Sequence, residues 1–472
     1  MNKAFNGKLL ATAMAGATAA AMSLTAVPAY AELSYKEIST NANFARDKPR
    51  VDRDSKGNYH IVYRMGDVGA AINSGMSGSN VGYMMVSPSG QVLIDEVKLT
   101  TDGTTNIGTA DVEVTSDDKV IVSYVFRTDR DLRLIKLDPS AAAQDGSAPA
   151  LGSITDVAEV VVADTFYHPF IELDSSDNVF VWSHNGRFAK YDSSLVNVLA
   201  VSSPFSGPNR SGHGTNPIAL DSDGNVHVVF QDCDEDLCPV SYGMIDGATG
   251  AVLIDQTPVA TSGLTTAAGS DTVVDNAPHA AHYSIMVDGK DQVRVVWVDK
   301  RYKPVWDDYC EVCASGGTLV YSKLDPSLDD QSGDAADIDV IKTVGDVEVG
   351  SYKYMQAFLA KNGVVQVFHG LRGDLNHLRI TSAGKASKSR HLTGDSTGFN
   401  RWNKKYPAGM ADNGALFFPV LDLATEGAGS RIVMGKVAIA SSSGGGGGGG
   451  TTAPAMLLLV LGSALLRRRM AR

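Results

Sequence analysis

A two-strand pattern recurs seven times along residues 41–440 of this 472-residue chain. Each copy has an apolar segment, a short turn of Asp, Asn and Gly, and a β-branched segment that ends on an aromatic side chain. In the fourth copy these parts are 217–221, 223–225 and 226–230. Turns of this composition favour positive φ and join the two strands of a hairpin. The closing aromatic side chains recur about every 60 residues and are Tyr63, Tyr124, Trp182, Phe230, Trp297, Phe368 and Phe418.

A second hairpin follows in several copies. The segment Gly90–Asp95 recurs as Gly250–Asp255, and Leu137–Ser140 recurs as Leu324–Ser327. Each copy therefore predicts four antiparallel strands, and repeats of this length predict a propeller, which protects its sheet edges by closing on itself. We expect an all-β fold, a seven-bladed β-propeller of four-stranded antiparallel blades, over residues 32–440. Residues 33–39 alternate like a strand and are expected to complete the last blade.

The first 31 residues have the composition of a secretory signal peptide. Lys3 and Lys8 precede an apolar, Ala-rich stretch, and Ala29-Tyr30-Ala31 is a small-x-small cleavage site. We therefore expect residues 1–31 to be a signal peptide that is removed on export. A retained membrane helix is the alternative.

The other end of the chain consists of a Ser/Gly-rich linker over 441–452 and an apolar tail over 453–472. An unbroken Gly run occupies 444–450, and an Arg cluster at 467–469 follows the apolar segment. This order of parts resembles the GlyGly-CTERM sorting signals of Gram-negative bacteria. The resemblance implies cleavage near the Gly run by a rhomboid-type sorting protease, with delivery to the cell surface or the medium. A permanent inner-membrane anchor is the alternative, since Arg beside an apolar segment also suits a transmembrane tail.

The chain is acidic, with 53 Asp and Glu against 41 Lys and Arg and a formal net charge of −12. Both end segments carry basic residues and no acidic ones, so the body of the protein is more acidic still. Nucleic-acid binding depends on Lys and Arg contacts to phosphate, so this balance argues against a nucleic-acid partner. A local basic pocket for a polyanion remains compatible with it.

The chain has four cysteines, in two pairs that are close in sequence: Cys233 with Cys238, and Cys310 with Cys313. In the oxidising compartment that an exported protein reaches, four cysteines predict two disulfides. Four cysteines allow three pairings, and the sequence does not choose between them. A zinc site with four thiolate ligands is the alternative.

The repeats resemble those of exported bacterial and archaeal propellers, on segments such as Pro217–Asp221 and Gly224–Phe230. They also resemble, more loosely, the BNR repeats of sialidase-like propellers. The resemblance implies blades and no particular reaction. The Asp-box of sialidases, Ser-x-Asp-x-Gly-x-x-Trp, is missing from the sequence, which argues against sialidase activity.

Long loops on a rigid scaffold are where binding sites usually lie. The loops expected on one face of the propeller are 65–79, 261–278 and 299–317, and histidine, basic and aromatic residues gather at the strand ends beside them. The candidate ligand-binding residues are His168, His184, Arg187, His213, His279, His282, Arg301, Tyr302, His369, Arg372, Trp402 and Lys404.

Cationic and aromatic side chains together suit an acidic sugar, because Arg and Lys pair with carboxylate or sulfate and aromatic rings stack on sugar faces. We expect a surface-displayed or secreted binding propeller that recognises a polysaccharide or a surface protein. The alternative is a polysaccharide-degrading enzyme acting on an acidic glycan, with a lyase favoured over a glycoside hydrolase. In a lyase, His168 or His282 would be the base. Arg187 or Arg301 would neutralise the uronate carboxylate.

Two further interpretations stay open at this point. A glycoside hydrolase needs two carboxyl groups, for which the candidates are Asp232, Asp299, Asp307 and Asp308. A purely structural surface protein would leave its His and Arg side chains solvated. The Asp-rich turns at 52–54 and 221–225 have part of the spacing of a calcium loop. We interpret them as turn formers, and no cofactor is expected.

Overall fold

The elements of the described residues are β-strands, and the part of the chain that carries them, Glu32–Ala438, forms one compact unit. The structure is a computed structural model. It describes residues 34–39, 44–67, 79–100, 107–140, 153–205, 216–231, 240–259, 280–299, 305–307, 310–325, 337–349, 355–360, 363–371, 374–392, 410–412, 415–422 and 431–438. The predicted signal peptide, linker and tail lie outside these ranges. Within them, no helix is long and apolar enough to cross a membrane.

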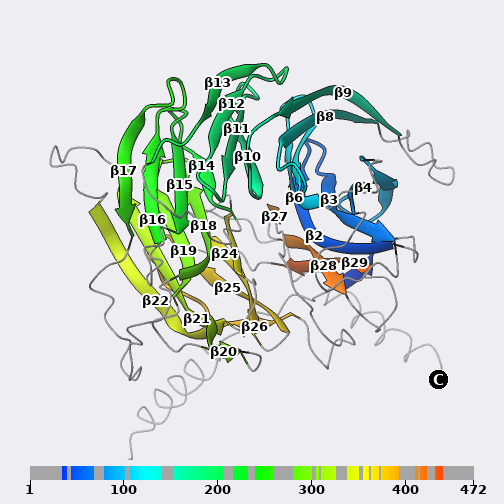
Figure 1. Ribbon diagram of the computed structural model, residues 1–472. Coiled ribbons are helices and arrows are strands. Elements are labelled where there is room, and N and C mark those ends of the chain that lie inside the picture. The colour runs from blue at the N-terminus through cyan, green and yellow to red at the C-terminus, as the bar shows by residue number, and fades with distance from the viewer. Residues whose placement is uncertain are drawn as a thin grey trace, which may run out of the picture. The chain divides into compact units, whose positions relative to one another are not determined.

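Six sheets are each built from strands that follow one another in the sequence (Figure 1). The first contains β2 (Phe44–Arg53), β3 (Tyr59–Asp67), β4 (Asn80–Val86) and β5 (Val92–Lys98). The second contains β6 (Ile107–Val114), β7 (Val120–Phe126), β8 (Leu132–Ser140) and β9 (Ser153–Val162). The third contains β10 (Pro169–Leu173), β11 (Val179–Ser183), β12 (Phe188–Tyr191) and β13 (Asn197–Ser202).

The other three continue this pattern along the chain. The fourth contains β14 (Ile218–Leu220), β15 (Val226–Gln231), β16 (Val240–Ile245) and β17 (Val252–Pro258). The fifth contains β18 (Ala280–Val287), β19 (Val293–Asp299), β20 (Val305–Asp307), β21 (Cys310–Asp325) and β22 (Asp337–Val349). The sixth contains β23 (Met355–Leu359), β24 (Val365–Leu371), β25 (Asp374–Ile380) and β26 (Arg390–His391).

A further four-stranded sheet combines the two ends of this unit, in the order β1, β29, β28 and β27. Its strands are β1 (Ser34–Glu37), β27 (Met410–Asp412), β28 (Ala415–Asp422) and β29 (Arg431–Ala438). The antiparallel register sets Ser34 opposite Lys436 and Glu37 opposite Val433. The expectation that residues 33–39 add a strand to the last repeat is therefore confirmed.

The fold is an all-β propeller with four-stranded antiparallel blades, as the repeats predict. The repeats also predicted seven blades, and in this respect the structure differs from the prediction. Six blades are each formed by one continuous stretch of chain. The seventh repeat contributes only three strands, and its sheet has four because β1 pairs with β29.

The first strand of each blade is the innermost one. Contacts between neighbouring blades join β2 to β6, β6 to β10, β10 to β14, β14 to β18 and β18 to β23. We call these first strands the inner strands. Each is followed by a tight turn into the second strand, and we call these the inner turns. Each inner strand has one edge that no strand of its own blade covers, and its backbone groups there face the neighbouring blade.

The second strand of each blade supplies most of the core. Every residue of β7, β15 and β19 is buried, because apolar side chains on both faces of the strand pack against neighbouring blades. Of the closing aromatic side chains, Trp182, Phe230 and Trp297 each keep only 1% of their surface exposed. Trp182 and Phe230 come from consecutive blades and lie with ring centroids 5.9 Å apart. The repeated aromatic position is thus a packing position between blades.

The long connection expected over 299–317 in the fifth blade contains a hairpin that the sequence did not predict. The blade itself is paired up to Asp299 and again from Thr318. Between them, Val305–Asp307 pairs with the first part of β21, which begins at Cys310.

Candidate functional site

About half of the predicted ligand-binding residues lie outside the described ranges. These are His213, His279, Arg301, Tyr302, Arg372, Trp402 and Lys404. The same holds for Cys233 and Cys238, whereas Cys310 and Cys313 have a described backbone in β21 but no described side chains. Disulfide pairing therefore stays a prediction.

His168 and His184 are brought together at one end of the third blade. Their ring centroids are 4.9 Å apart, and His184 packs against Phe170 with ring centroids 5.2 Å apart. His168 precedes β10, and its Nδ1 lies 3.0 Å from the Thr109 hydroxyl on β6 of the second blade. His168 has a φ of 51°, a left-handed conformation that is uncommon for a residue other than glycine. The pair therefore sits at a constrained junction of two blades.

Two arginines and a tyrosine adjoin this histidine pair. The guanidinium of Arg130 lies 4.1 Å from the ring centroid of Tyr167, whose side chain is 36% exposed. The carbonyl of Arg130 accepts a hydrogen bond from Phe166, and the carbonyl of Tyr167 accepts one from the backbone N–H of His184, 2.8 Å away. These backbone bonds fix the position of the exposed groups relative to one another.

The Arg187 side chain completes the group. It donates to the Ser203 hydroxyl over 3.1 Å and lies 3.4 Å from the Asp164 carboxylate. We call this set of residues the His–Arg patch. It consists of Arg130, Tyr167, His168, His184 and Arg187. It lies at the end of β10 and β11 opposite their inner turn, because Pro169 pairs with Ser183 at this end and Leu173 with Val179 at the other.

The other two described histidines of the prediction are buried in other blades. His282 has a φ of 50° and occupies the register shift of β18 between Ala281 and Tyr283 in the fifth blade. His369 on β24 of the sixth blade is 1% exposed, and its Nε2 lies 2.8 Å from the Ser389 hydroxyl.

A second group, which the sequence analysis did not single out, lies on the inner strands of the first three blades. Asp52 on β2, Glu113 on β6 and Glu172 on β10 each stand two residues before the first residue of an inner turn, and Asp111 precedes Glu113 by two residues. We call Asp52, Asp111, Glu113 and Glu172 the carboxyl cluster. All four are half-buried. Arg50 is the cation nearest to it, with Nε 4.0 Å from Asp111 Oδ1.

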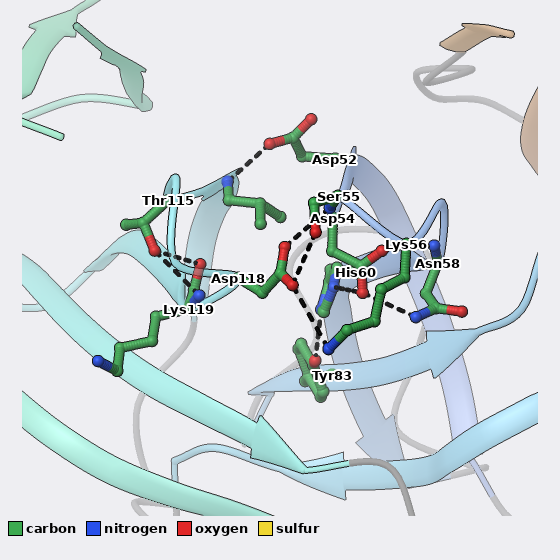
Figure 2. Close-up of polar contacts among 11 residues, drawn as sticks. Asp52, Asp54, Ser55, Lys56, Asn58, His60, Tyr83, Thr115, Asp118 and Lys119 are labelled. Carbon is green, nitrogen blue, oxygen red and sulfur yellow. Dashed lines mark hydrogen bonds and ion pairs between the residues drawn. The ribbon is translucent and has the colours of Figure 1, made fainter. Parts of the chain in front are cut away.

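Two members of the cluster connect one inner strand to the next. Asp52 Oδ2 accepts a hydrogen bond from the backbone N–H of Val114 over 2.6 Å, a contact drawn in Figure 2. Asp111 Oδ2 accepts one from the backbone N–H of Ile171 over 3.2 Å. An inner strand exposes N–H groups along its free edge, and a carboxyl oxygen from the preceding blade satisfies one of them in each case.

The pKa values of all four carboxyl groups are raised. Burial is the main cause for Asp52, and it raises the pKa of this group to about 6 even though the Val114 N–H and His60 act in the opposite direction. Burial, with Asp52, Glu172 and Asp111 as negative neighbours, raises the pKa of Glu113 well above its ordinary range. Burial, with Asp111 and Asp52 nearby, raises the pKa of Glu172 to about 8. The pKa of Asp111 is raised by burial, and Arg50 partly offsets this.

The sequence held a signal for this cluster. An acidic residue stands at the same place in three consecutive repeats, in Val51-Asp52, Val112-Glu113 and Ile171-Glu172. An acidic side chain in an otherwise apolar strand is costly unless it has a partner, so repetition of one at a fixed position indicates a shared environment.

Of the four carboxylates considered for glycoside hydrolysis, the side chain of Asp299 alone falls within the described part of the chain. Asp299 is fully buried, and the Trp297 indole N–H donates to it over 3.5 Å. Asp232 and Asp308 lie outside the described residues, as does the side chain of Asp307.

The Asp-rich turns hold the backbone, as interpreted from the sequence. Asp54 accepts from the Asn58 N–H and Nδ2, each over 2.7 Å. Asp221 accepts the corresponding bonds from Asn225, over 2.7 and 2.9 Å. In the described ranges no three His, Cys, Asp or Glu residues are grouped so as to hold a metal ion.

Comparison with known proteins gives structural likeness only. No protein-family model and no curated protein sequence matches the chain. Among solved structures it is similar to a protein of unknown function from Dyadobacter fermentans DSM 18053, with 11% sequence identity and a TM-score of 0.47, over 88% of this chain and 100% of that one. It is also similar to the polysaccharide lyase Uly1, with 11% identity and a TM-score of 0.48, over 88% of this chain and 94% of that one.

Proposed function

We propose that this protein is an exported binding propeller that holds an acidic polysaccharide on the His–Arg patch. The proposal takes the composite sheet of β1 and β27–β29 as the seventh blade of a closed ring. It also takes the predicted signal peptide and sorting tail as the route to the cell surface or the medium.

One observation carries the proposal: the Arg130 guanidinium stacked 4.1 Å from the centroid of the exposed Tyr167 ring, beside the His168–His184 pair. Exposed aromatic rings stack on sugar faces, and guanidinium groups pair with carboxylate or sulfate. In a chain with a net charge of −12, the Arg130 guanidinium provides a local positive charge for an anionic ligand, while Arg187 is partly neutralised by Asp164.

The test is retention of the purified protein on immobilised acidic and neutral polysaccharides. The variant Arg130→Gln combined with Tyr167→Ala should reduce retention on the acidic ligands by about tenfold or more, since each lost contact contributes roughly 1 kcal/mol. The matched control is Lys290→Gln, which removes an exposed cation from an inner turn at the other end of the strands. Retention that falls equally in the control and the patch variant would contradict the proposal. A surface protein as the ligand would appear as no retention on any polysaccharide.

A polysaccharide lyase is the second candidate. The observation that favours it is the His168–His184 ring pair, with Arg130 over the ring of the neighbouring Tyr167 and with Arg187 three residues after His184. An imidazole could remove the proton next to a uronate carboxylate while a guanidinium stabilises the developing negative charge. New unsaturated chain ends, lost in His168→Gln and retained in Lys290→Gln, would establish it. Retention without new ends would support the binding propeller alone.

A further inference from the structure

The bridges between inner strands do not in themselves require carboxyl groups. Between the fifth and sixth blades, the Ser284 hydroxyl accepts the backbone N–H of Ala357 over 3.2 Å. Ser284 stands four residues before the inner turn of its blade, and Asp111 stands four residues before the turn of the second blade. A neutral side chain therefore makes this bridge between the fifth and sixth blades, whereas acidic side chains make it among the first three blades.

Four carboxyl groups lie on these strands, and in the described part of the chain Arg50 is a cation that contacts one of them, Asp111. Fully ionised, they would place four negative charges around Arg50 in a half-buried region, where charges are poorly screened. Carboxyl groups at short range cannot all be ionised. One of them then keeps its proton and donates a hydrogen bond to another.

The described neighbours provide little further positive charge. The strand β3 contributes His60, Arg64 and Asp67, and of these His60 interacts electrostatically with Asp52. The strands β4, β7, β11 and β14, which pack against β2, β6 or β10 or extend their blades, contain no Asp, Glu, His, Lys or Arg, and their titratable side chains are the phenols of Tyr83 and Tyr124. The side chains of β27 and β28 beside β2 lie outside the described part of the chain.

We propose that the inner strands of the first three blades form a proton-linked joint, in which protonated Glu113 donates a hydrogen bond to Asp52 while Asp52 accepts the Val114 N–H. Loss of the Glu113 proton replaces this hydrogen bond by repulsion between two carboxylates. The contact that it weakens is the one between the first and second blades, because Asp52 belongs to β2 and both Glu113 and Val114 belong to β6.

The raised pKa values of Glu113 and Glu172 agree with this arrangement. A carboxyl group with a raised pKa holds a proton in the folded chain that it releases on unfolding. Stability is then greatest at acid pH and falls as the pH rises through the folded-state value. The carboxyl cluster should therefore lose stability as the pH rises from about 5, with Glu172 losing its proton near pH 8 and Glu113, whose pKa is raised well above its ordinary range, acting in the same direction.

The first experiment measures the unfolding midpoint of the full chain by chemical denaturation from pH 5 to pH 8. The wild type should lose stability across this interval. Glu113→Gln should be less sensitive to pH and more stable than the wild type at pH 8, because glutamine donates the same hydrogen bond and cannot ionise. The matched control Glu159→Gln changes an exposed acid on β9 and should follow the wild type. A Glu113→Gln profile that parallels the wild type would overturn the proposal.

A second measurement keeps the proposal testable if Glu113→Gln does not fold. Difference infrared spectra of the native wild-type chain report the C=O stretch of protonated carboxyl groups directly. The band should persist at pH 7, and the part of it that comes from Glu172 should disappear with a midpoint near pH 8. Glu172→Gln should remove that part of the signal. Complete loss of the band below pH 6 would show that the cluster is ionised and would overturn the joint.

Discussion

Ser55 donates two hydrogen bonds to a single carboxylate on the next blade, that of Asp118. Its backbone N–H lies 2.8 Å from Asp118 Oδ1, and its hydroxyl lies 2.9 Å from Oδ2 (Figure 2). The same two-bond contact joins Ser116 to Asp177 and Ser222 to Asp291. In each pair the serine is the second residue of one inner turn, and the aspartate is the fourth residue of the next. The inner turns are thus linked from blade to blade.

Removing this link should destabilise the protein, and the loss should include a coupling free energy between Ser55 and Asp118. The fourth turn position has positive φ, 61° at Asp118, and glycine occupies it at Gly57 and Gly224, so Asp118→Gly deletes the carboxylate without backbone strain. In a double-mutant cycle with Ser55→Ala, we expect a coupling free energy of about 1 kcal/mol. Denaturant unfolding of the four proteins measures it. Strictly additive effects would show that the contact contributes nothing.

The link can also be added where the sequence lacks it. Ser175 stands at the donor position of the third blade, but the fourth position of the next turn is Gly224, which has no carboxylate. A Cβ added at Gly224 meets no atom within 4 Å, and its φ of 81° lies in the region that Asp118, Asp177 and Asp291 adopt. A side chain at this φ is strained, and the strain reduces the gain from the new hydrogen bonds, so Gly224→Asp should raise the free energy of unfolding by less than about 1 kcal/mol. The control is Gly224→Asp combined with Ser175→Ala, which should lose the gain; a gain that survives would have another origin.

A buried histidine in the fourth blade depends on a tyrosine hydroxyl. His227 is fully buried, with Nδ1 2.8 Å from the Tyr242 hydroxyl and Nε2 3.1 Å from Asp221 Oδ2. Tyr242→Phe leaves a buried imidazole nitrogen without its partner and should cost about 1–3 kcal/mol of unfolding free energy.

The fifth blade provides a matched control for this substitution. Tyr321 occupies the equivalent place, since it pairs with Val296 as Tyr242 pairs with Val229. Among the described residues its hydroxyl has no hydrogen-bond partner. Tyr321→Phe should be neutral or slightly stabilising, because it removes a buried polar atom that makes no bond. Equal losses in the two variants would mean that the tyrosine–histidine bond is not what stabilises the fourth blade.

The parts of the fold that were predicted correctly are those that each repeat specifies by itself. Alternating apolar residues and a Gly- or Asp-rich turn were enough to locate pairs such as β14 and β15, and to identify β1 as a strand of the last sheet. The hairpin at β20 was missed because its strands are short and lie among Asp and Cys residues, where composition favours a loop.

The candidate site could be predicted only in part, for a different reason. His168 and His184 were predicted as site residues because both lie at strand ends. The two strands of one hairpin pair Pro169 with Ser183, and this brings the neighbouring histidines together. The carboxyl cluster depends instead on which inner strands are neighbours and on which side chains share a low-dielectric environment. Asp52 and Glu172 are far apart in sequence, and no local pattern around either residue gives the raised pKa.

The inner turns should also set an acid limit to stability, opposite in sign to the effect of the carboxyl cluster. Burial alone would raise the pKa of Asp54, but hydrogen bonds from His60 and Asn58 outweigh it and lower the pKa to about 2. At Asp221, burial likewise would raise the pKa, but hydrogen bonds from His227 and Asn225 outweigh it and lower the pKa to about 2. A lowered carboxyl pKa contributes stability above the ordinary value near 4 and loses it as the pH falls toward 2.

Each of these two aspartates should therefore contribute on the order of 2 kcal/mol at pH 6 that is absent at pH 2. Together with the carboxyl cluster, whose contribution declines from about pH 5 upward, they predict a stability maximum near pH 4 to 5. Unfolding midpoints of Asp221→Asn measured from pH 2 to pH 6 should show a shallower acid limb than the wild type, while Asp223→Asn, an exposed neighbour in the same turn, should reproduce the wild-type slope. An acid limb of the same steepness in Asp221→Asn would show that the His227–Asp221 contact does not persist in solution.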